Sequence, residues 1–150
     1  MVDYDLIKSQ MEALSEDAPD FIPVMANVSA LLFSEMPEVN WAGFYLVKED
    51  DLILGPFQGK VACVRIARGK GVCGTAWDTD SVQLVPDVHA FPGHIACDSA
   101  SRSEIVVPIH SDGEVKAVLD IDSPVTGRFT EADKDGLVRL VESMETVMIW

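Results

Sequence analysis

The chain has 150 residues, of which 48% are hydrophobic, so it is long enough for one folded domain with a substantial core and is not a disordered chain. Its 25 acidic residues outnumber the 11 basic ones, giving a formal net charge of −14. So acidic a surface repels phosphate backbones and anionic lipids, which argues against nucleic acid and membranes as partners. The first residues do not resemble a signal peptide, and we expect a cytoplasmic protein.

Helices are predicted at both ends of the chain. A short helix is expected around Tyr4 to Leu14. A second one follows, where apolar residues recur at helical spacing: Phe21, Val24, Met25, Val28, Leu31 and Leu32. Near the carboxyl end, Thr130 is expected to cap a helix with its own apolar stripe: Leu137, Leu140, Val141, Met144, Val147 and Met148. We expect both stripes to pack in the core. The apolar VMIW sequence at the carboxyl end is compatible with a homodimer and equally with a place in the core.

Between these helices the apolar residues repeat with a period of two. Strands are predicted from Trp41 to Val47 and from Leu52 to Gly55, joined by an acidic turn. A second hairpin is predicted for EIVVPIH and VKAVLDID, across a turn with glycine at its tip. Tight hairpins produce an antiparallel sheet, so the predicted fold class is α+β. The section 57–103, rich in Gly, Asp, His and Pro, is expected to be irregular and to carry function.

The segment AVLDIDS places two carboxylates, Asp120 and Asp122, on one face of a strand, because side chains alternate along an extended chain. Carboxylates avoid dry interiors unless they are paired, so the two together indicate a site. Glu104 begins the partner strand, while Trp41 and Tyr45, four residues apart, share a face of their own strand. On one side of the sheet, the five would form an acidic pocket with an aromatic wall, suited to a small cationic or amphoteric ligand. Plain core positions and ordinary salt bridges are the alternatives.

The segment GKGVCG, residues 69–74, matches the dinucleotide pattern G-x-G-x-x-G but lies among hairpins rather than in a parallel β-α-β unit. We predict instead a loop that opens a short helix from Val72 to Trp77, with free backbone N–H groups for a small carboxylate. His89, His94 and Cys97 lie close in sequence, but their spacing fits no paired zinc-ligand frame. No metal and no cofactor are therefore expected.

The three cysteines are Cys63, Cys73 and Cys97, an odd number that argues against a structural disulfide framework. Cys97 is flanked by small and polar residues, in keeping with an exposed and reactive thiol. Buried and inert thiols are the alternative, because free cysteine is among the most buried residue types.

Four segments resemble the free methionine-(R)-sulfoxide reductases, which are stand-alone GAF domains: NWAGFYLV, LGPFQGKVACVRIARGKGVCGTA, DVHAFPGHIACDSASRSEIVVPI and VLDIDSPVTGRFTEAD. The resemblance implies a single GAF domain over residues 1–150. In that fold, terminal helices pack on one face of a central antiparallel sheet, and loops cover a pocket on the other face. The resemblance also implies an enzyme that reduces the R-sulfoxide of free L-methionine.

The same resemblance implies roles for the cysteines. Cys97 would be the nucleophile, Cys63 the resolving thiol, and Cys73 an auxiliary or alternative partner. Attack on the substrate would leave a sulfenic acid, which becomes a disulfide. Thioredoxin or a similar dithiol would then reduce that disulfide.

The resemblance also implies that Glu104, Asp120 and Asp122 are the pocket carboxylates and that Trp41 and Tyr45 are its aromatic wall. We expect Asp120 to bind the substrate ammonium, and Glu104 with Asp122 to act on the sulfoxide. Three other functions remain open at this point: a GAF module that senses a small molecule, a thiol redox sensor without turnover, and a zinc-binding structural module.

Overall fold

The structure is a computed structural model and describes residues 1–94 and 99–150. Its helices are α1 (Tyr4–Leu14), α2 (Phe21–Glu35), α3 (Gly71–Thr79) and α4 (Glu131–Val147), with one 3₁₀ turn, η1 (Val88–Ala90). Its strands are β1 (Trp41–Lys48), β2 (Asp51–Gly59), β3 (Arg65–Ala67), β4 (Gln83–Val85), β5 (Ser103–Ser111) and β6 (Glu114–Ser123). No helix in the described part of the chain is long and apolar enough to cross a membrane.

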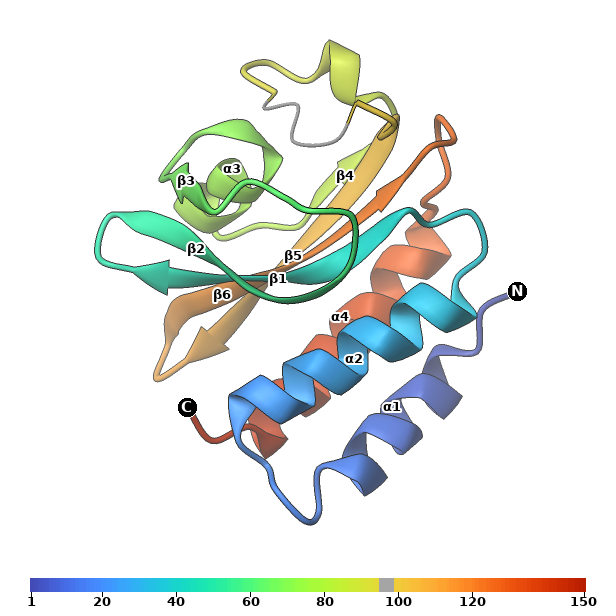
Figure 1. Ribbon diagram of the computed structural model, residues 1–150, viewed down its shortest axis with the longest axis vertical. Coiled ribbons are helices and arrows are strands. Elements are labelled where there is room, and N and C mark those ends of the chain that lie inside the picture. The colour runs from blue at the N-terminus through green and yellow to red at the C-terminus, as the bar shows by residue number, and fades with distance from the viewer. Residues whose placement is uncertain (95–98) are drawn as a thin grey trace.

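The strands form one antiparallel sheet in the order β3-β2-β1-β6-β5-β4. Helices α1, α2 and α4 lie together on one face of this sheet, and α3 lies on the opposite face (Figure 1). The predicted α+β architecture is therefore confirmed, with the terminal helices on one face. All pairs of named strands are antiparallel, so the described chain has no parallel β-α-β unit around residues 69–74.

Alternation along the central strands divides the apolar side chains between two cores. Phe44 of β1 and Leu119 of β6 pack against the terminal helices, whereas Tyr45 and Val118 belong to the core on the α3 side. The helical stripes are buried as predicted, at Val24, Met25, Val28 and Leu32 of α2 and at Leu137, Leu140, Val141 and Met144 of α4. Because the period is two, the same alternation turns Asp120 and Asp122 toward the α3 side.

The largest differences from the sequence prediction lie in the section 57–103. The short helix predicted from Val72 to Trp77 is confirmed as α3, but β3, β4 and η1 were not predicted, and β2 continues to Gly59 instead of ending at Gly55. Strands β3 and β4 have three residues each, too few to show a period in the sequence. They form because β2 and β5 offer free edges for pairing, a tertiary effect that local sequence does not encode.

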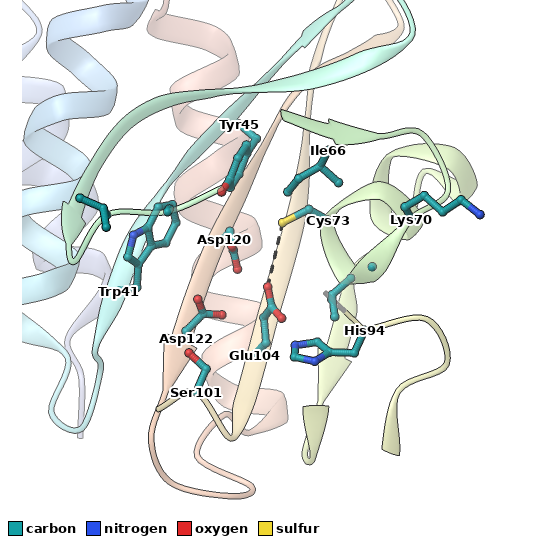
Figure 2. Close-up of a pocket in the computed structure, with 14 residues that line it drawn as sticks. Trp41, Tyr45, Ile66, Lys70, Cys73, His94, Ser101, Glu104, Asp120 and Asp122 are labelled. Carbon is teal, nitrogen blue, oxygen red and sulfur yellow. Dashed lines mark hydrogen bonds between the residues drawn. The ribbon is translucent and has the colours of Figure 1, made fainter. Parts of the chain in front are cut away.

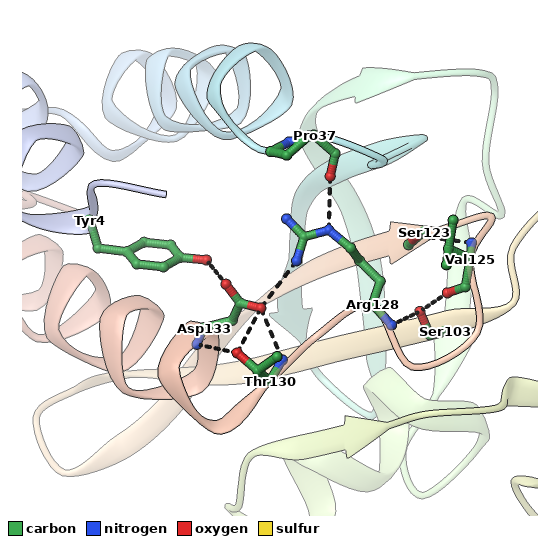
Figure 3. A network of polar contacts seen from close by, with 8 residues as sticks. All are labelled: Tyr4, Pro37, Ser103, Ser123, Val125, Arg128, Thr130 and Asp133. Atoms are coloured by element: carbon green, nitrogen blue, oxygen red, sulfur yellow. Dashed lines mark hydrogen bonds and ion pairs between the residues drawn. The ribbon is translucent and has the colours of Figure 1, made fainter. Parts of the chain in front are cut away.

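A polar network joins the start of α4 to the rest of the helical layer (Figure 3). Thr130 caps α4 as predicted: its hydroxyl accepts from the N–H of Asp133 at 3.2 Å, and the Asp133 carboxylate accepts from the N–H of Thr130 at 2.9 Å. Tyr4 donates to Asp133 at 2.6 Å, and Arg128 contacts it at 3.1 Å. Burial opposes ionisation of Asp133, but the Tyr4 hydrogen bond and the other contacts lower its pKa overall.

Gly136 of α4 allows Tyr4 to lie close against the helix. A Cβ at Gly136 would lie 2.2 Å from Cδ2 and 2.4 Å from Cγ of Tyr4. We expect Gly136→Ala to lower the free energy of unfolding by about 2 kcal/mol, because the overpacking outweighs the roughly 1 kcal/mol gain in helix propensity. Denaturant unfolding measures this, with the exposed Asp135→Ala as control. Equal or higher stability of Gly136→Ala would contradict this packing.

Candidate active site

Three carboxylates of β5 and β6 meet on the α3 side of the sheet (Figure 2). Glu104 of β5 lies directly opposite Asp122 of β6, and Asp120 follows two residues away on the same face. Glu104 is 7% exposed and Asp120 is 5% exposed, while Asp122 is half-buried. All three line one pocket. Like charges placed opposite each other across strands destabilise a sheet, so this arrangement points to function rather than to folding.

Strand β1 supplies an aromatic wall beside the carboxylates. Trp41 lies opposite Asp122 in the register of β1 and β6, and Tyr45 follows four residues along β1. The rings of Trp41 and Tyr45 are stacked, with centroids 5.9 Å apart, and the ring of Phe57 of β2 also stacks with Trp41 at 5.2 Å. Trp41 and Tyr45 are both almost completely buried and line the same pocket as the carboxylates. The five residues singled out in the sequence are thus brought together.

The pocket is strongly acidic, and the basic groups of its described lining are Lys70 and His94. Burial, followed by the charge of His89, lowers the pKa of His94 despite the opposing effect of Asp120. Burial, followed by the negative charges of Asp120 and Asp122, raises the pKa of Glu104 well above its usual range. Burial also raises the pKa of Asp120, although hydrogen bonds with Glu104 and Cys73 partly oppose this effect. Lys70 lines the pocket, but its ammonium group points away from the carboxylates (Figure 2). Protonated and ionised carboxyl groups can therefore coexist here, as acid–base chemistry requires.

Helix α3 brings Cys73 into this acidic surrounding. Cys73 is a free thiol, 4% exposed, and its Sγ donates to Oε2 of Glu104 across 4.0 Å. Burial, and then the charges of Asp120 and Glu104, raise the pKa of this thiol well above its usual range. A thiol held in its protonated form is a poor nucleophile.

The segment 60–63 lies over the aromatic wall and is fixed at several points. Nε1 of Trp41 donates to the carbonyl of Lys60 at 3.1 Å, and the hydroxyl of Tyr45 donates to the carbonyl of Cys63 at 2.8 Å. Cys63 itself is disulfide-bonded. Cys97, predicted as the nucleophile, lies outside the described residues. Val61 and Ala62 also line the pocket but were not among the predicted site residues. Their only signal in the sequence was an apolar run in an otherwise polar loop.

The amino terminus of α3 also faces the pocket, through Gly71, Val72 and Cys73. The first N–H groups of a helix have no partner within the helix, and the side chain of the N-cap residue, Lys70, makes no capping hydrogen bond. The N–H of Gly69 donates instead to the carbonyl of Gly74, at 3.0 Å. Residues 71–73, rather than the whole predicted loop, therefore present donors that suit a small carboxylate.

The histidines considered as metal ligands do not form a metal site in the described structure. The rings of His89 and His94 are 6.4 Å apart and meet edge to face. Among the described side chains, the donor atoms that converge closely enough to hold an ion are those of Cys73, Glu104 and Asp120. Neither histidine belongs to this group. The potential metal ligands that the structure brings together therefore differ from the histidines that were considered because of their closeness in the sequence.

With Cys63 in a disulfide, the pocket has a volume of about 40 Å³. That volume accommodates a few water molecules, whereas small-molecule pockets usually measure about 300–1,000 Å³. We expect reduction of the disulfide to release the segment 60–63 and to strengthen binding of a small amphoteric ligand, such as a free apolar amino acid, at least about tenfold. Calorimetric titration with and without a dithiol measures this, and Cys63→Ser should bind equally under both conditions. Equal affinity of the wild-type protein in both states would contradict this role of the segment.

The fold and the pocket define the class of protein. Residues 25–148 match the model of the GAF domain family. The chain is 52% identical to the free methionine-R-sulfoxide reductase of Escherichia coli, over 97% of this chain and 88% of the relative. It is thus a member of the free methionine-R-sulfoxide reductases within the GAF domain family.

Solved structures agree with this assignment. The structure of fRMsr of Staphylococcus aureus in its reduced form superimposes with a TM-score of 0.95 at 50% identity, covering 99% of this chain and 97% of that one. Free methionine-R-sulfoxide reductase from Neisseria meningitidis, solved in complex with its substrate, gives a TM-score of 0.91 at 45% identity, over 95% and 86% of the two chains.

Proposed function

We propose that this protein reduces the R-sulfoxide of free L-methionine, with Cys97 as the nucleophile. The observation that carries the proposal is the pocket in which the buried Glu104 and Asp120 and the half-buried Asp122 lie beside the stacked Trp41 and Tyr45. Relatives and solved structures of the same family support the reaction class. An anionic nucleotide, as a sensing module of this fold could bind, would enter so acidic a pocket poorly.

The three recognition groups of the pocket fit the three ends of the substrate. Oδ1 of Asp120 is buried and has no hydrogen-bond partner among the described residues, so it suits an ammonium group. The N–H groups of residues 71–73 suit the α-carboxylate, which a peptide-bonded methionine lacks. The rings of Trp41 and Tyr45 offer an apolar surface for the S-methyl group.

The chemistry then divides between acids and thiols. Glu104, whose pKa is raised by burial and by its acidic neighbours, and Asp122 protonate the sulfoxide oxygen as the S–O bond breaks. The thiolate of Cys97 attacks the substrate sulfur and forms an S–S bond to it. The protonated oxygen then transfers from that sulfur to Sγ of Cys97 as the S–S bond breaks, so methionine leaves and Cys97 becomes a sulfenic acid. Cys63 then attacks that sulfur and releases water, forming a disulfide. Two electrons from an external dithiol restore both thiols.

Replacement of Cys63 tests the resolving step. We expect Cys63→Ser to release about one methionine per chain and then to stop, because Cys73 is held as a buried thiol and resolves a sulfenic acid slowly. A dimedone adduct detected by mass spectrometry would identify the trapped sulfenic acid. Sustained turnover with thioredoxin in a variant lacking both Cys63 and Cys73 would rule this step out.

The remaining parts of the proposal concern partners and place. Thioredoxin or a similar dithiol is the proposed reductant, and a reducing cytoplasm is the proposed location, since the cycle depends on removal of a disulfide.

We also propose a homodimer that uses the surface around the carboxyl terminus, where Ile22 and Ile149 are more than half exposed and Trp150 stacks on Phe21 at 5.4 Å. Sedimentation analysis distinguishes a dimer from a monomer.

A further inference from the structure

Three potential metal ligands from different elements converge in the pocket: Sγ of Cys73 on α3, and one carboxylate oxygen each from Glu104 on β5 and Asp120 on β6. These donor atoms all lie within 4.8 Å of one another, and all three residues are buried. Figure 2 shows the three side chains directed toward one another. Because a helix and two central strands carry them, the site is largely formed before any ligand arrives.

A second observation points to a positively charged occupant. Asp120 lines the pocket and is only 5% exposed, and its Oδ1 is buried with no hydrogen-bond partner among the described residues. Buried polar atoms are almost always satisfied, so this oxygen marks the place of a missing partner. The one lysine of the described lining, Lys70, directs its ammonium group elsewhere (Figure 2). The volume of about 40 Å³ admits an ion with a water molecule.

The chemistry of the donors selects the kind of ion. A thiolate with two carboxylates suits a borderline-soft cation such as Zn²⁺, whereas Mg²⁺ and Ca²⁺ prefer oxygen ligands alone. Zn–S and Zn–O bonds of about 2.3 and 2.1 Å place tetrahedral donors roughly 3.6 Å apart, so small side-chain rotations are sufficient. On binding, the Cys73 thiol releases its proton to solvent.

We infer that the pocket, when it holds no substrate, binds one Zn²⁺ through Cys73, Glu104 and Asp120. The ion and the amino acid then exclude each other, because both need Asp120. This second statement rests on the proposed function, in which Asp120 binds the ammonium group, and it makes Zn²⁺ a competitive inhibitor of the reductase. Cys73 gains a role that does not require it to act as a nucleophile.

A full-length variant carrying Cys63→Ser and Cys97→Ser tests the site, because Cys73 is then the chain's one thiol. Titration with Cd²⁺, which gives a thiolate-to-metal charge-transfer band in the ultraviolet, is expected to saturate at one ion per chain. Added Zn²⁺ should remove the band by displacing Cd²⁺. Further replacement by Cys73→Ser should abolish the band, and Asp120→Asn should weaken binding at least about tenfold. The exposed Asp135→Asn should leave the affinity unchanged.

Absence of the band, or an affinity that Asp120→Asn leaves unchanged, would overturn the metal site. These readings involve no turnover, so such a failure leaves the reductase proposal intact. Saturating methionine should weaken Cd²⁺ binding at least about tenfold. Undiminished Cd²⁺ binding in its presence would instead overturn the mutual exclusion and the assignment of Asp120 to the ammonium group.

Discussion

Cys97→Ser is expected to lower methionine formation at least about 10³-fold, because a serine hydroxyl is a far weaker nucleophile toward sulfur than a thiolate. The two remaining cysteines cannot substitute. The proposed role of Cys63 begins only once a sulfenic acid exists, and burial with acidic neighbours raises the pKa of Cys73. The measurement is methionine released from the R-sulfoxide with thioredoxin as reductant.

Cys97→Ser must be shown to be folded, by an unchanged thermal unfolding transition, before its loss of activity is interpreted. Activity within about tenfold of wild type in the folded variant would contradict the nucleophile assignment. The thiol redox sensor, by comparison, requires no turnover from the wild-type protein at all.

Asp120→Asn is expected to lower kcat/KM by about 10²–10³-fold, since removing one partner of a buried charge pair costs about 2–5 kcal/mol. The buried Oδ1 of Asp120, without a partner among the described residues, is the proposed contact of the substrate ammonium. The control is Asp135→Asn, which replaces an exposed carboxylate of α4 and should leave kcat/KM within about twofold.

A substrate without an ammonium group separates this contact from general damage to the pocket. The sulfoxide of 4-(methylthio)butanoate keeps the carboxylate and the sulfur at the same separation as in methionine but lacks the amine. Wild type and Asp120→Asn should turn it over at rates within about threefold of each other, because the lost interaction does not exist for this compound. An equally large loss with both substrates would contradict the assignment of Asp120 to the ammonium group.

Much of this site could be predicted because strand periodicity is a local property. Two residues separated by one position share a face wherever the strand lies, so the pairing of Asp120 with Asp122 follows from the segment itself. In the hairpin of β5 and β6, a one-residue register shift between Ile109 and His110 then places Glu104 opposite Asp122, and the turn alone does not encode that shift. The match of Trp41 with Asp122 depends on β1 pairing with β6, which the local sequence does not encode. The family resemblance implied only that these residues share a pocket.

The role of Cys73 could not be predicted, because its surroundings come from distant parts of the chain. Its sequence neighbours are glycines and apolar residues, typical of an inert buried thiol. Packing of α3 across β5 and β6 places its Sγ beside Glu104, 31 residues away in the sequence. The same packing raises the pKa of the Cys73 thiol and brings Cys73 together with Glu104 and Asp120 as potential metal ligands. By contrast, closeness in the sequence was the only reason to consider His89, His94 and Cys97 together as metal ligands.

A single-turnover reaction tests the central claim most directly. Fully reduced protein is mixed with free L-methionine R-sulfoxide or S-sulfoxide, without external reductant, and both released methionine and remaining thiols are counted per chain. We predict about one methionine per chain from the R-sulfoxide, with the loss of two thiols, and none from the S-sulfoxide. No methionine and no loss of thiols with either compound would contradict the reductase and favour a module that binds its ligand without chemistry.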